Sequence, residues 1–492
     1  MLYHFNKSIL LNTMKRNILT ISLLALMVTG LTAQNEQDVL RYSFVQTGGT
    51  TRSLSMGGAL GAVGGDFAAI SINPAGLGIY RTGEFSFTGD YNAYSSDTRY
   101  LGNSMKDNGF KMGLSHFGLA IPINFNSEES GIKGFTFAVG YNKLRDYGQY
   151  ITMKGINNSN SLVDGFVTSA NQNNAQWDPF TDGLAWETYL IDYDSAAGVY
   201  FSDFDGSAYG QTQRRTVTTK GSLGEYDFSL GLNLSDKLFF GATMGIQRAD
   251  YSEVWEHSET DPNDVINFFN EFSFRNTLNT NGSGVNFKLG LLAKPIEFLR
   301  IGVSIQTPTI LKLKDDFRSY MSTSLNDGLS DHTYDADGNY NYSITTPFRA
   351  TGSLAVIFKQ YGLISIDYEY VDYSSGRLRS SEYDFFSENE SVTTRFKATS
   401  NIRIGGELRL MGSYYIRGGY AYYGSPYVTE EPNAGKNLNV YSCGVGFRDK
   451  LYYLDLGFSR SGWDQTYFLY GNNSAEVTNA QSRFSATLGF KF

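Results

Sequence analysis

Several residue types that mark other protein classes are scarce in this chain of 492 residues. Its one cysteine, Cys443, cannot form an internal disulfide. The formal net charge of −9 leaves no basic stripe to neutralise phosphates, which argues against nucleic acid as a partner. Beyond Ala33 no apolar stretch approaches the roughly 18 residues of a transmembrane helix. No Pro- or Ser-rich linker divides the chain, so a series of soluble domains is not expected.

The chain does contain a repeated alternation of apolar and polar residues, between about Gly83 and Phe492. In the last run one face carries Phe484, Ala486, Leu488, Phe490 and Phe492, and the other carries Arg483, Ser485, Thr487, Gly489 and Lys491. A period of two with one apolar and one polar face predicts a half-buried strand. The aromatic content of 15% suits girdles at a membrane interface, although a large soluble β protein can be as aromatic.

About fourteen strands are predicted from these runs. They are Glu84–Tyr94, Met112–Ile123, Lys133–Asp146, Ser222–Leu234, Lys237–Trp255, Gly284–Lys294, Leu299–Leu313, Tyr340–Phe358, Tyr361–Tyr373, Thr394–Leu410, Ser413–Tyr423, Asn437–Phe447, Leu451–Gly462 and Gln481–Phe492. The connections between them alternate between tight and long. The long ones are expected around 95–111, 147–221, 256–283, 314–339, 374–393, 424–436 and 463–480.

The two kinds of connection distinguish a membrane barrel from a soluble sandwich. Outer-membrane barrels have short periplasmic turns and longer extracellular loops, whereas a sandwich has no reason to keep its long loops at one end. We therefore predict an all-β fold, a transmembrane antiparallel β-barrel of about 14 strands with lipid outside and a polar lumen. In this register Cys443 faces lipid.

Charged residues in the predicted strands lie opposite the apolar face. An Arg or Lys facing lipid at the bilayer midplane costs about 2–4 kcal/mol, so Arg349, Arg403 and Arg417 are expected to face the lumen. Their simplest role there is in structural ion pairs with residues such as Asp367 and Glu369 that brace a wide barrel.

The N-terminus has the features of an export signal. A basic start at Met14-Lys15-Arg16 precedes an apolar stretch from Ile18 to Val28, and Leu31-Thr32-Ala33 is a small-residue cleavage site. The apolar stretch is too short to span a bilayer of about 30 Å. We predict a signal peptide at residues 1–33, with Met14 as the true start and Gln34 as the first mature residue. Export and the barrel pattern together predict the bacterial outer membrane.

Residues 34–82 do not alternate, and small residues dominate the runs Gly57–Asp66 and Ser71–Gly78. Small residues permit close backbone packing, and Asn-Pro followed by Gly indicates a turn. The glycines lack the Lys-Ser/Thr and the βαβ context of a nucleotide loop. A compact segment before a large barrel predicts an N-terminal plug, or hatch, within the lumen. Its candidate residues are Gly57, Gly58, Asn73, Pro74, Ala75 and Gly76.

The order of these motifs resembles the outer-membrane transporters of long-chain fatty acids and hydrophobic compounds, the FadL-like barrels. The matching motifs are Ser55–Ala59, Asp66–Ala69, Asn73–Gly76, Phe117–Ile123, Thr346–Phe348 with Gly352, Ile402–Glu407 and Ile416–Tyr420 through Pro426. They cover essentially the whole mature chain, from the hatch (34–82) through the barrel (83–492). The resemblance implies passive transport of a small hydrophobic ligand, with capture by extracellular loops, a pocket near the hatch and release through the barrel wall into outer-membrane lipid.

Three groups of residues are candidates for that pathway. Trp177 and Trp186, in the polar loop 147–221, form an apolar landing surface or simply pack the loop. Any carboxylate on the ligand would need a lumen cation, and Arg349, Arg403 and Arg417 are the candidates. Gly140 is the candidate for a lateral exit because glycine weakens strand pairing and permits a kink.

Other functions stay open on the sequence alone. The same fold can bind a secreted protein partner, and a wide polar lumen would favour that function, whereas apolar residues above the hatch would favour transport. Haem uptake would use His257 and His332 as axial ligands. The four histidines form no catalytic constellation, so we expect no enzyme, no resident cofactor and no metal site.

These patterns predict a heat-modifiable protein that is extracted by detergent and begins at Gln34. The barrel-assembly machinery is an expected partner, because the final strand ends in the aromatic Phe492. Deleting Phe492 should slow assembly, measured as a delayed appearance of the heat-modifiable band in pulse-chase gels. Recovery of the protein in the soluble periplasmic fraction would contradict the prediction.

Overall fold

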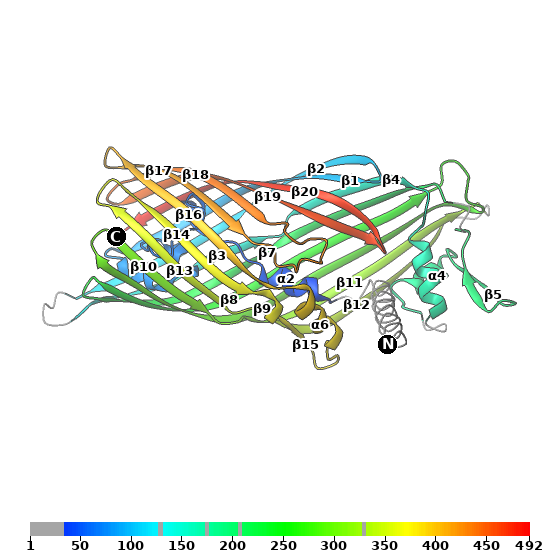
Figure 1. Ribbon diagram of the computed structural model, residues 1–492, viewed down its shortest axis with the longest axis horizontal. Coiled ribbons are helices and arrows are strands. Elements are labelled where there is room, and N and C mark those ends of the chain that lie inside the picture. The colour runs from blue at the N-terminus through cyan, green and yellow to red at the C-terminus, as the bar shows by residue number, and fades with distance from the viewer. Residues whose placement is uncertain (1–33, 126–130, 173–176, 205–208, 327–330) are drawn as a thin grey trace, which may run out of the picture.

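The computed structural model describes residues 34–125, 131–172, 177–204, 209–326 and 331–492. The predicted signal peptide lies outside these residues. The chain forms a closed antiparallel β-barrel of 14 strand positions, which confirms the predicted fold. Closure is direct, because Glu84–Arg99 of the first strand pairs with Glu476–Lys491 of the last. Figure 1 shows the barrel with its long axis horizontal.

Fourteen positions form the wall, and two of them are each divided into two strands. In order around the barrel they are β1 (Glu84–Tyr100), β2 (Asn103–Asn124), β3 (Ile132–Asp146), β7 (Gln211–Leu234), β8 (Leu238–Thr260), β9 (Phe269–Ile296), β10 with β11 (Leu299–Gln306, Ile310–Leu325), β13 with β12 (Arg349–Phe358, His332–Thr345), β14 (Gly362–Asp372), β16 (Ala398–Leu410), β17 (Tyr414–Tyr423), β18 (Leu438–Arg448), β19 (Tyr452–Tyr470) and β20 (Asn473–Lys491). Both divisions fall at a proline, Pro308 and Pro347, which has no N–H for the ladder.

The remaining elements belong to the loops and to the N-terminal segment. Two short strands extend the sheet, β4 (Gln149–Asn157) and β15 (Arg377–Arg379), and β5 (Asp192–Asp194) with β6 (Val199–Phe201) forms a separate hairpin. The helices are α2 (Glu36–Ser43), α3 (Thr51–Ser55), α4 (Val163–Gln172), α5 (Asp182–Glu187) and α6 (Phe386–Arg395), and the 3₁₀ turns are η1 (Phe67–Ser71), η2 (Pro74–Ile79) and η3 (Tyr373–Ser375). None of the helices in the described ranges is long and apolar enough to cross a bilayer.

All fourteen predicted strands are present, but several predicted long loops are wrong. β1 and β2 meet in a turn at Leu101-Gly102, and β19 and β20 meet in a turn at Gly471-Asn472. These strands continue well beyond the expected ends. The alternation becomes weaker there because the outward face meets water instead of lipid, so that polar residues occupy both faces.

The outer wall carries a belt of exposed apolar side chains. Phe137, Phe228, Phe287, Ile366 and Leu488 are each 41–55% exposed. A continuous apolar surface of this kind on a closed barrel is the lipid-facing belt of a transmembrane protein. Cys443 is exposed on this face, as predicted.

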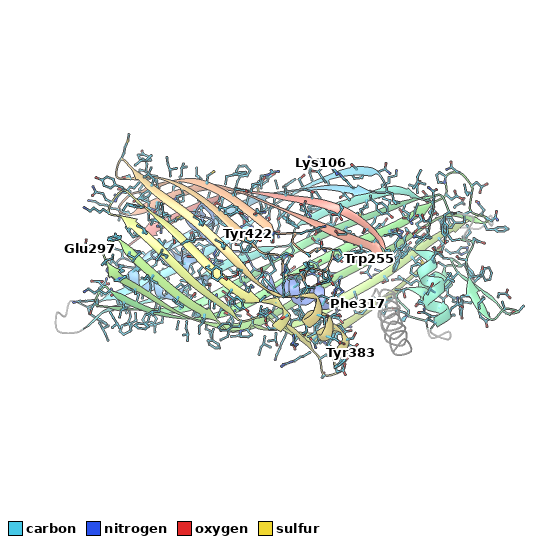
Figure 2. All side chains as sticks on the ribbon, in the orientation of Figure 1. Lys106, Trp255, Glu297, Phe317, Tyr383 and Tyr422 are labelled. Carbon is cyan, nitrogen blue, oxygen red and sulfur yellow. The ribbon has the colours of Figure 1, made fainter. Side chains whose placement is uncertain are left out.

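The two ends of the barrel differ. The long loops lie at one end, whereas the described connections between strands at the end near the C-terminus are all tight turns. At one of these turns Ser235 and Asp236 have φ values of 54° and 57°, in the left-handed region that tight hairpin turns use. In Figures 1 and 2, Glu297 lies at this end, whereas α4 and β5 lie at the opposite end. The first is therefore the periplasmic end and the second the extracellular end.

Candidate functional site

Residues 34–82 lie inside the barrel and touch its wall on several sides. Phe67 would collide with a side chain at the wall glycines Gly118 and Gly140, and Gly57 would collide with one at Gly419. A Cβ atom at Gly419 would lie 2.2 Å from the amide nitrogen of Gly57. These wall glycines let the segment approach the strand backbones closely, so it fills the periplasmic half of the lumen.

Four short capped turns explain how a segment so rich in small residues keeps a fixed shape. The side chains of Asn35, Thr50, Asp66 and Asn73 each accept a hydrogen bond from a backbone N–H at the start of α2, α3, η1 and η2. Such caps satisfy donors that would otherwise be unpaired at a helix start. The Asn35 and Asp38 pair is a complete capping box, a sequence signal that predicts the start of α2.

The Asn73-Pro74-Ala75-Gly76 motif fastens the segment to the wall. Asn73 Oδ1 accepts from the N–H of Ala75 at 3.1 Å, and Nδ2 donates to the carbonyls of Gly61 at 2.8 Å and Leu291 at 3.2 Å. Pro74 occupies the first turn of η2, where its missing N–H costs nothing. One side chain thus joins two parts of the segment to strand β9.

Gly57 and Gly58 form a turn between α3 and the next part of the segment. Their φ values of 62° and 77° lie in the left-handed region that favours glycine. The Gly57 N–H donates to Ser442 Oγ of β18 at 3.1 Å.

Buried ion pairs join the segment to the other side of the wall. Arg52 makes two hydrogen bonds of 2.9 Å to the carboxylate of Glu407. Arg417 also bonds Glu407 and donates to Asp455, both at 2.6 Å. Arg417 is fully buried in this network, which gives it a bracing role, and its Nη2 atom has no hydrogen-bond partner among the described residues.

Arg349 and Arg403 have different surroundings from Arg417. Both bond the carboxylate of Glu369, and Arg349 also donates to the carbonyl of Ser43 at the end of α2. The Nε and Nη2 atoms of Arg403 have no hydrogen-bond partner among the described residues. Both arginines line a cavity of about 40 Å³, whose other lining residues include Val45, Gln46, Leu144, Glu225 and Lys288. That volume holds only a few water molecules.

An apolar layer separates this cavity from the extracellular half of the barrel. Val39 and Tyr42 of α2 are 1% exposed and pack against inward-facing residues of the wall and of the α6 loop. These partners include Leu144, Leu223, Leu311, Leu313, Ile344, Val371 and Phe385. Burial raises the pKa of Asp38 on this helix to about 6, although the nearby Arg41 lowers it.

Beside the cavity the wall is interrupted between β2 and β3. These strands pair only from His116–Asn142 to Asn124–Gly134. Further toward the loops, within the described ranges, β2 pairs with β1 alone, and β3 and then β4 pair with β7. The predicted exit residue Gly140 lies on the lumen face of β3, two residues before this break.

Side chains bridge the break where the backbones do not. Lys143 Nζ donates to Asp90 at 2.8 Å, and Lys111 Nζ lies 3.5 Å from Asp146. Farther out, Asp107 accepts from the N–H and hydroxyl of Thr152. A wall held by side chains alone can separate without breaking a strand ladder.

The N-terminal segment runs directly behind the break. The N–H of Gln46 donates to the carbonyl of Leu144 at 3.0 Å, and Arg145 donates to the carbonyls of Arg41 and Phe44, both at 3.1 Å. On the outward face of the β2 edge, Phe110 and Met112 are 68% and 74% exposed. The break therefore has an apolar rim outside and the end of α2 inside.

The long loop 147–221 folds over the extracellular end. Residues of α4 and α5 share one large apolar cluster with residues of β4, β8, β9 and β20, and Trp177 and Trp186 pack against this cluster. The two indole rings lie 5.1 Å apart, and each makes an edge contact with Tyr200. This arrangement is compatible both with an apolar landing surface for a ligand and with simple packing of the loop.

The two histidines of the haem hypothesis lie in strands and not in loops, contrary to expectation. His257 is a fully buried residue of β8 bonded to Glu259 at 2.9 Å, whereas His332 at the start of β12 packs on Tyr189. No group of three metal-binding side chains occurs in the ranges that the structure describes.

These features define a transmembrane β-barrel of the bacterial outer membrane whose own N-terminal segment occupies the lumen. The fold is shared with a FadL homologue of Pseudomonas aeruginosa, at a TM-score of 0.55 and 16% identity over 92% of this chain and 100% of that one. It is also shared with the toluene transporter TodX of P. putida, at 0.54 and 13% identity over 91% and 99%. No protein-family model and no curated protein matches the sequence. The resemblance inferred from the motifs is confirmed for the fold.

Replacing Arg52 with methionine should loosen residues 34–82 while leaving the barrel folded. Breaking a buried ion pair typically costs about 3–5 kcal/mol. The cost here is smaller, because the carboxylate of Glu407 still has its ion pair with Arg417 in the variant. Hydrogen exchange of the segment, measured by mass spectrometry in detergent, should accelerate. Arg81→Met is the matched control, because Arg81 and Asp236 form an exposed pair that contributes less than about 1 kcal/mol. Equal exchange in wild type and both variants would contradict the prediction.

Proposed function

We propose that this barrel admits small hydrophobic compounds, long-chain fatty acids among them, across the outer membrane by passive flow. The observation that carries the proposal is the break between β2 and β3, with an apolar rim outside and the N-terminal segment behind it. In this proposal residues 1–33 are the signal peptide, 34–82 the hatch and 83–492 the barrel.

Capture begins at the folded loop 147–221. Trp177, Trp186 and Tyr200 offer aromatic surface beside the large apolar cluster of the extracellular end. Burial of a ligand there is favourable by about 0.8 kcal/mol for each methylene group. No energy source is needed for movement down a concentration gradient.

The ligand then crosses the apolar layer around α2. This layer joins α2 of the hatch to the wall, and an apolar lumen at this level favours transport over the binding of a secreted protein, for which a wide polar lumen would be expected. A ligand with a carboxylate head meets Arg349 and Arg403 at the cavity. The Nε and Nη2 atoms of Arg403 have no hydrogen-bond partner among the described residues, and Nε lies 3.8 Å from Asp367, so both could donate to such a carboxylate. Arg417 lies outside this cavity, so we assign it only to the ion-pair network.

Exit follows through the wall into the lipid. Displacement of α2 and Val45–Thr47 would widen the cavity toward the break, whose inner end lies just beyond Gly140. On the outward face, Tyr141 packs against Phe117 and Tyr226 at 5.9 and 5.2 Å, an aromatic group suited to the membrane interface. The shared fold with a FadL homologue and a toluene transporter supports this pathway.

The two other functions have less support. Binding of a secreted protein remains the alternative if uptake fails, with the loop region as the contact surface. Haem uptake has little support, because Glu259 already engages the ring of His257 in a buried site.

The hatch is tested by its removal. Deletion of Gln34–Arg81 should leave the barrel heat-modifiable and create a nonselective pore, because the deleted segment fills the periplasmic half of the lumen. Single-channel conductance in planar bilayers would then exceed that of the full chain. An unchanged conductance would show that the segment does not block the lumen.

The lateral exit is tested by a reversible lock across the break. Asp107→Cys with Thr152→Cys, in a Cys443→Ser background, places two thiols where a carboxylate now bonds the Thr152 backbone. Oxidation should reduce uptake of labelled oleate by cells to the level of a null strain, and dithiothreitol should restore it. Cys443→Ser alone is the control.

Two further outcomes separate the alternatives. Full uptake through the oxidised double variant would exclude this exit but leave transport intact. Wild-type uptake no better than the null strain would exclude oleate transport and leave the partner-binding function.

A further inference from the structure

A polar cleft opens on the outer surface of the barrel toward its extracellular end, away from the pathway just described. Its volume is about 400 Å³, and small-molecule sites typically measure about 300–1,000 Å³. It lies beside the start of β18, whereas the tight turn to β19 follows the other end of that strand. The strands β18, β19 and β20 run side by side along the upper wall in Figure 1. The lining residues are Gly435, Lys436, Asn437, Asn439, Asp464, Glu476, Val477 and Thr478.

The polar cleft forms where β18 stops pairing with β19. The last pair is Asn439 with Gly462, and β19 continues beyond it as a free edge. At Thr466 this edge is covered, because the N–H and carbonyl of Thr466 bond the side chain of Asn433 at 2.7 and 3.2 Å. Backbone groups two residues apart in a strand point the same way, so the N–H and carbonyl of Asp464 face the cleft. No backbone group of the described residues pairs with them on this side.

The side chains of the polar cleft present hydrogen-bond donors and acceptors next to one another. Lys436 Nζ donates to Glu476 at 2.9 Å, and the hydroxyl of Thr478 donates to one oxygen of Asp464 at 2.7 Å. The second oxygen of Asp464 has no hydrogen bond from a described residue and remains an acceptor. The Oδ1 atom of Asn439 already accepts a hydrogen bond, whereas its Nδ2 group remains a donor.

The charges around the polar cleft balance, and its wall offers little to an apolar ligand. On the outward faces of β1, β19 and β20 and on the loop before β18, the nearby charges are Asp97, Arg99, Lys436, Arg460, Asp464 and Glu476. An anion or a metal ion therefore meets no clear excess of opposite charge. Val477 is the one apolar side chain of the lining and is 1% exposed. The ligand that fits is polar and neutral.

We propose that the polar cleft is a binding site for a neutral saccharide. Sugar hydroxyl groups both donate and accept, so they can bond the free oxygen of Asp464, the Nδ2 group of Asn439 and the free edge of β19 together. Tyr441, two residues beyond Asn439 on the same outward face, is 63% exposed and offers an aromatic surface for the C–H groups of a sugar ring. Two sources share this chemistry, a glycolipid headgroup of the outer leaflet and a free oligosaccharide.

The site is tested with the purified full-length barrel in an amine-oxide detergent, which carries no sugar. The probe is an array of neutral, sulfated and sialylated glycans, each attached through a polar spacer or through an alkyl chain, and bound barrel is detected with an antibody. Wild type should bind a neutral glycan better than its charged forms, and neither about 0.5 M salt nor EDTA should weaken binding, because no ion contributes. Binding through the polar spacer identifies a free oligosaccharide as the source, and binding of the alkyl-linked form alone identifies a glycolipid.

Two variants test the polar cleft itself, and both should stay heat-modifiable because the changed residues are exposed. Asp464→Ala removes a charged acceptor and should weaken binding of that glycan by about 10-fold or more. Thr478→Trp fills the cleft and should abolish binding. The matched controls, Asp335→Ala and Thr333→Trp at exposed positions of β12, should bind as wild type does. The proposal is overturned if no neutral glycan binds in either form, if charged glycans bind equally well, if EDTA abolishes binding, or if the cleft variants bind as well as their controls.

Discussion

The constraint on which the rest of the structure depends is that no backbone N–H or C=O group can remain unpaired in the hydrocarbon of a bilayer. A closed barrel satisfies this rule with strand ladders alone, and here β1 completes the circle by pairing with β20. The one interruption in the described wall, between β2 and β3, begins beside the aromatic group Phe117–Tyr141, at the interface and not in the middle of the belt. Even there, the segment inside supplies Gln46 to pair with Leu144.

The same rule explains the chemistry of the lumen. A wall with lipid on one side must place its charges inward, and those charges need partners in a closed space. The N-terminal segment provides some of them, through Arg52 to Glu407 and the carbonyl of Ser43 to Arg349. The segment therefore contributes polar partners as well as bulk, and its position depends on residues more than 300 positions away in the sequence.

The features that could be predicted from the sequence are those that depend on a local pattern of residues. Strand alternation and the tight turns are local, so all fourteen strands could be found, and Asn73-Pro74 could be recognised as a turn. The strand extensions at the extracellular end could not be predicted, because their outward faces lack the apolar residues by which a lipid-facing strand is recognised. Arg349, Arg403 and Arg417 could be assigned to the lumen. Their different surroundings could not be predicted, because these depend on Glu407, Glu369 and α2 meeting in three dimensions.

The bond from Gln46 to Leu144 also bears on how a barrel with an interrupted wall avoids leaking. If the segment moved away without a ligand, a buried carbonyl would be left without its partner, at a cost of about 1–3 kcal/mol. Breaking the hydrogen bonds that Arg145 donates to the segment would add to that cost. The open form would then be a minor species at rest, and only a molecule that interacts more strongly with it could raise its population. Permeability would be coupled to occupancy, so the barrel would stay closed to other solutes without a separate gatekeeping domain.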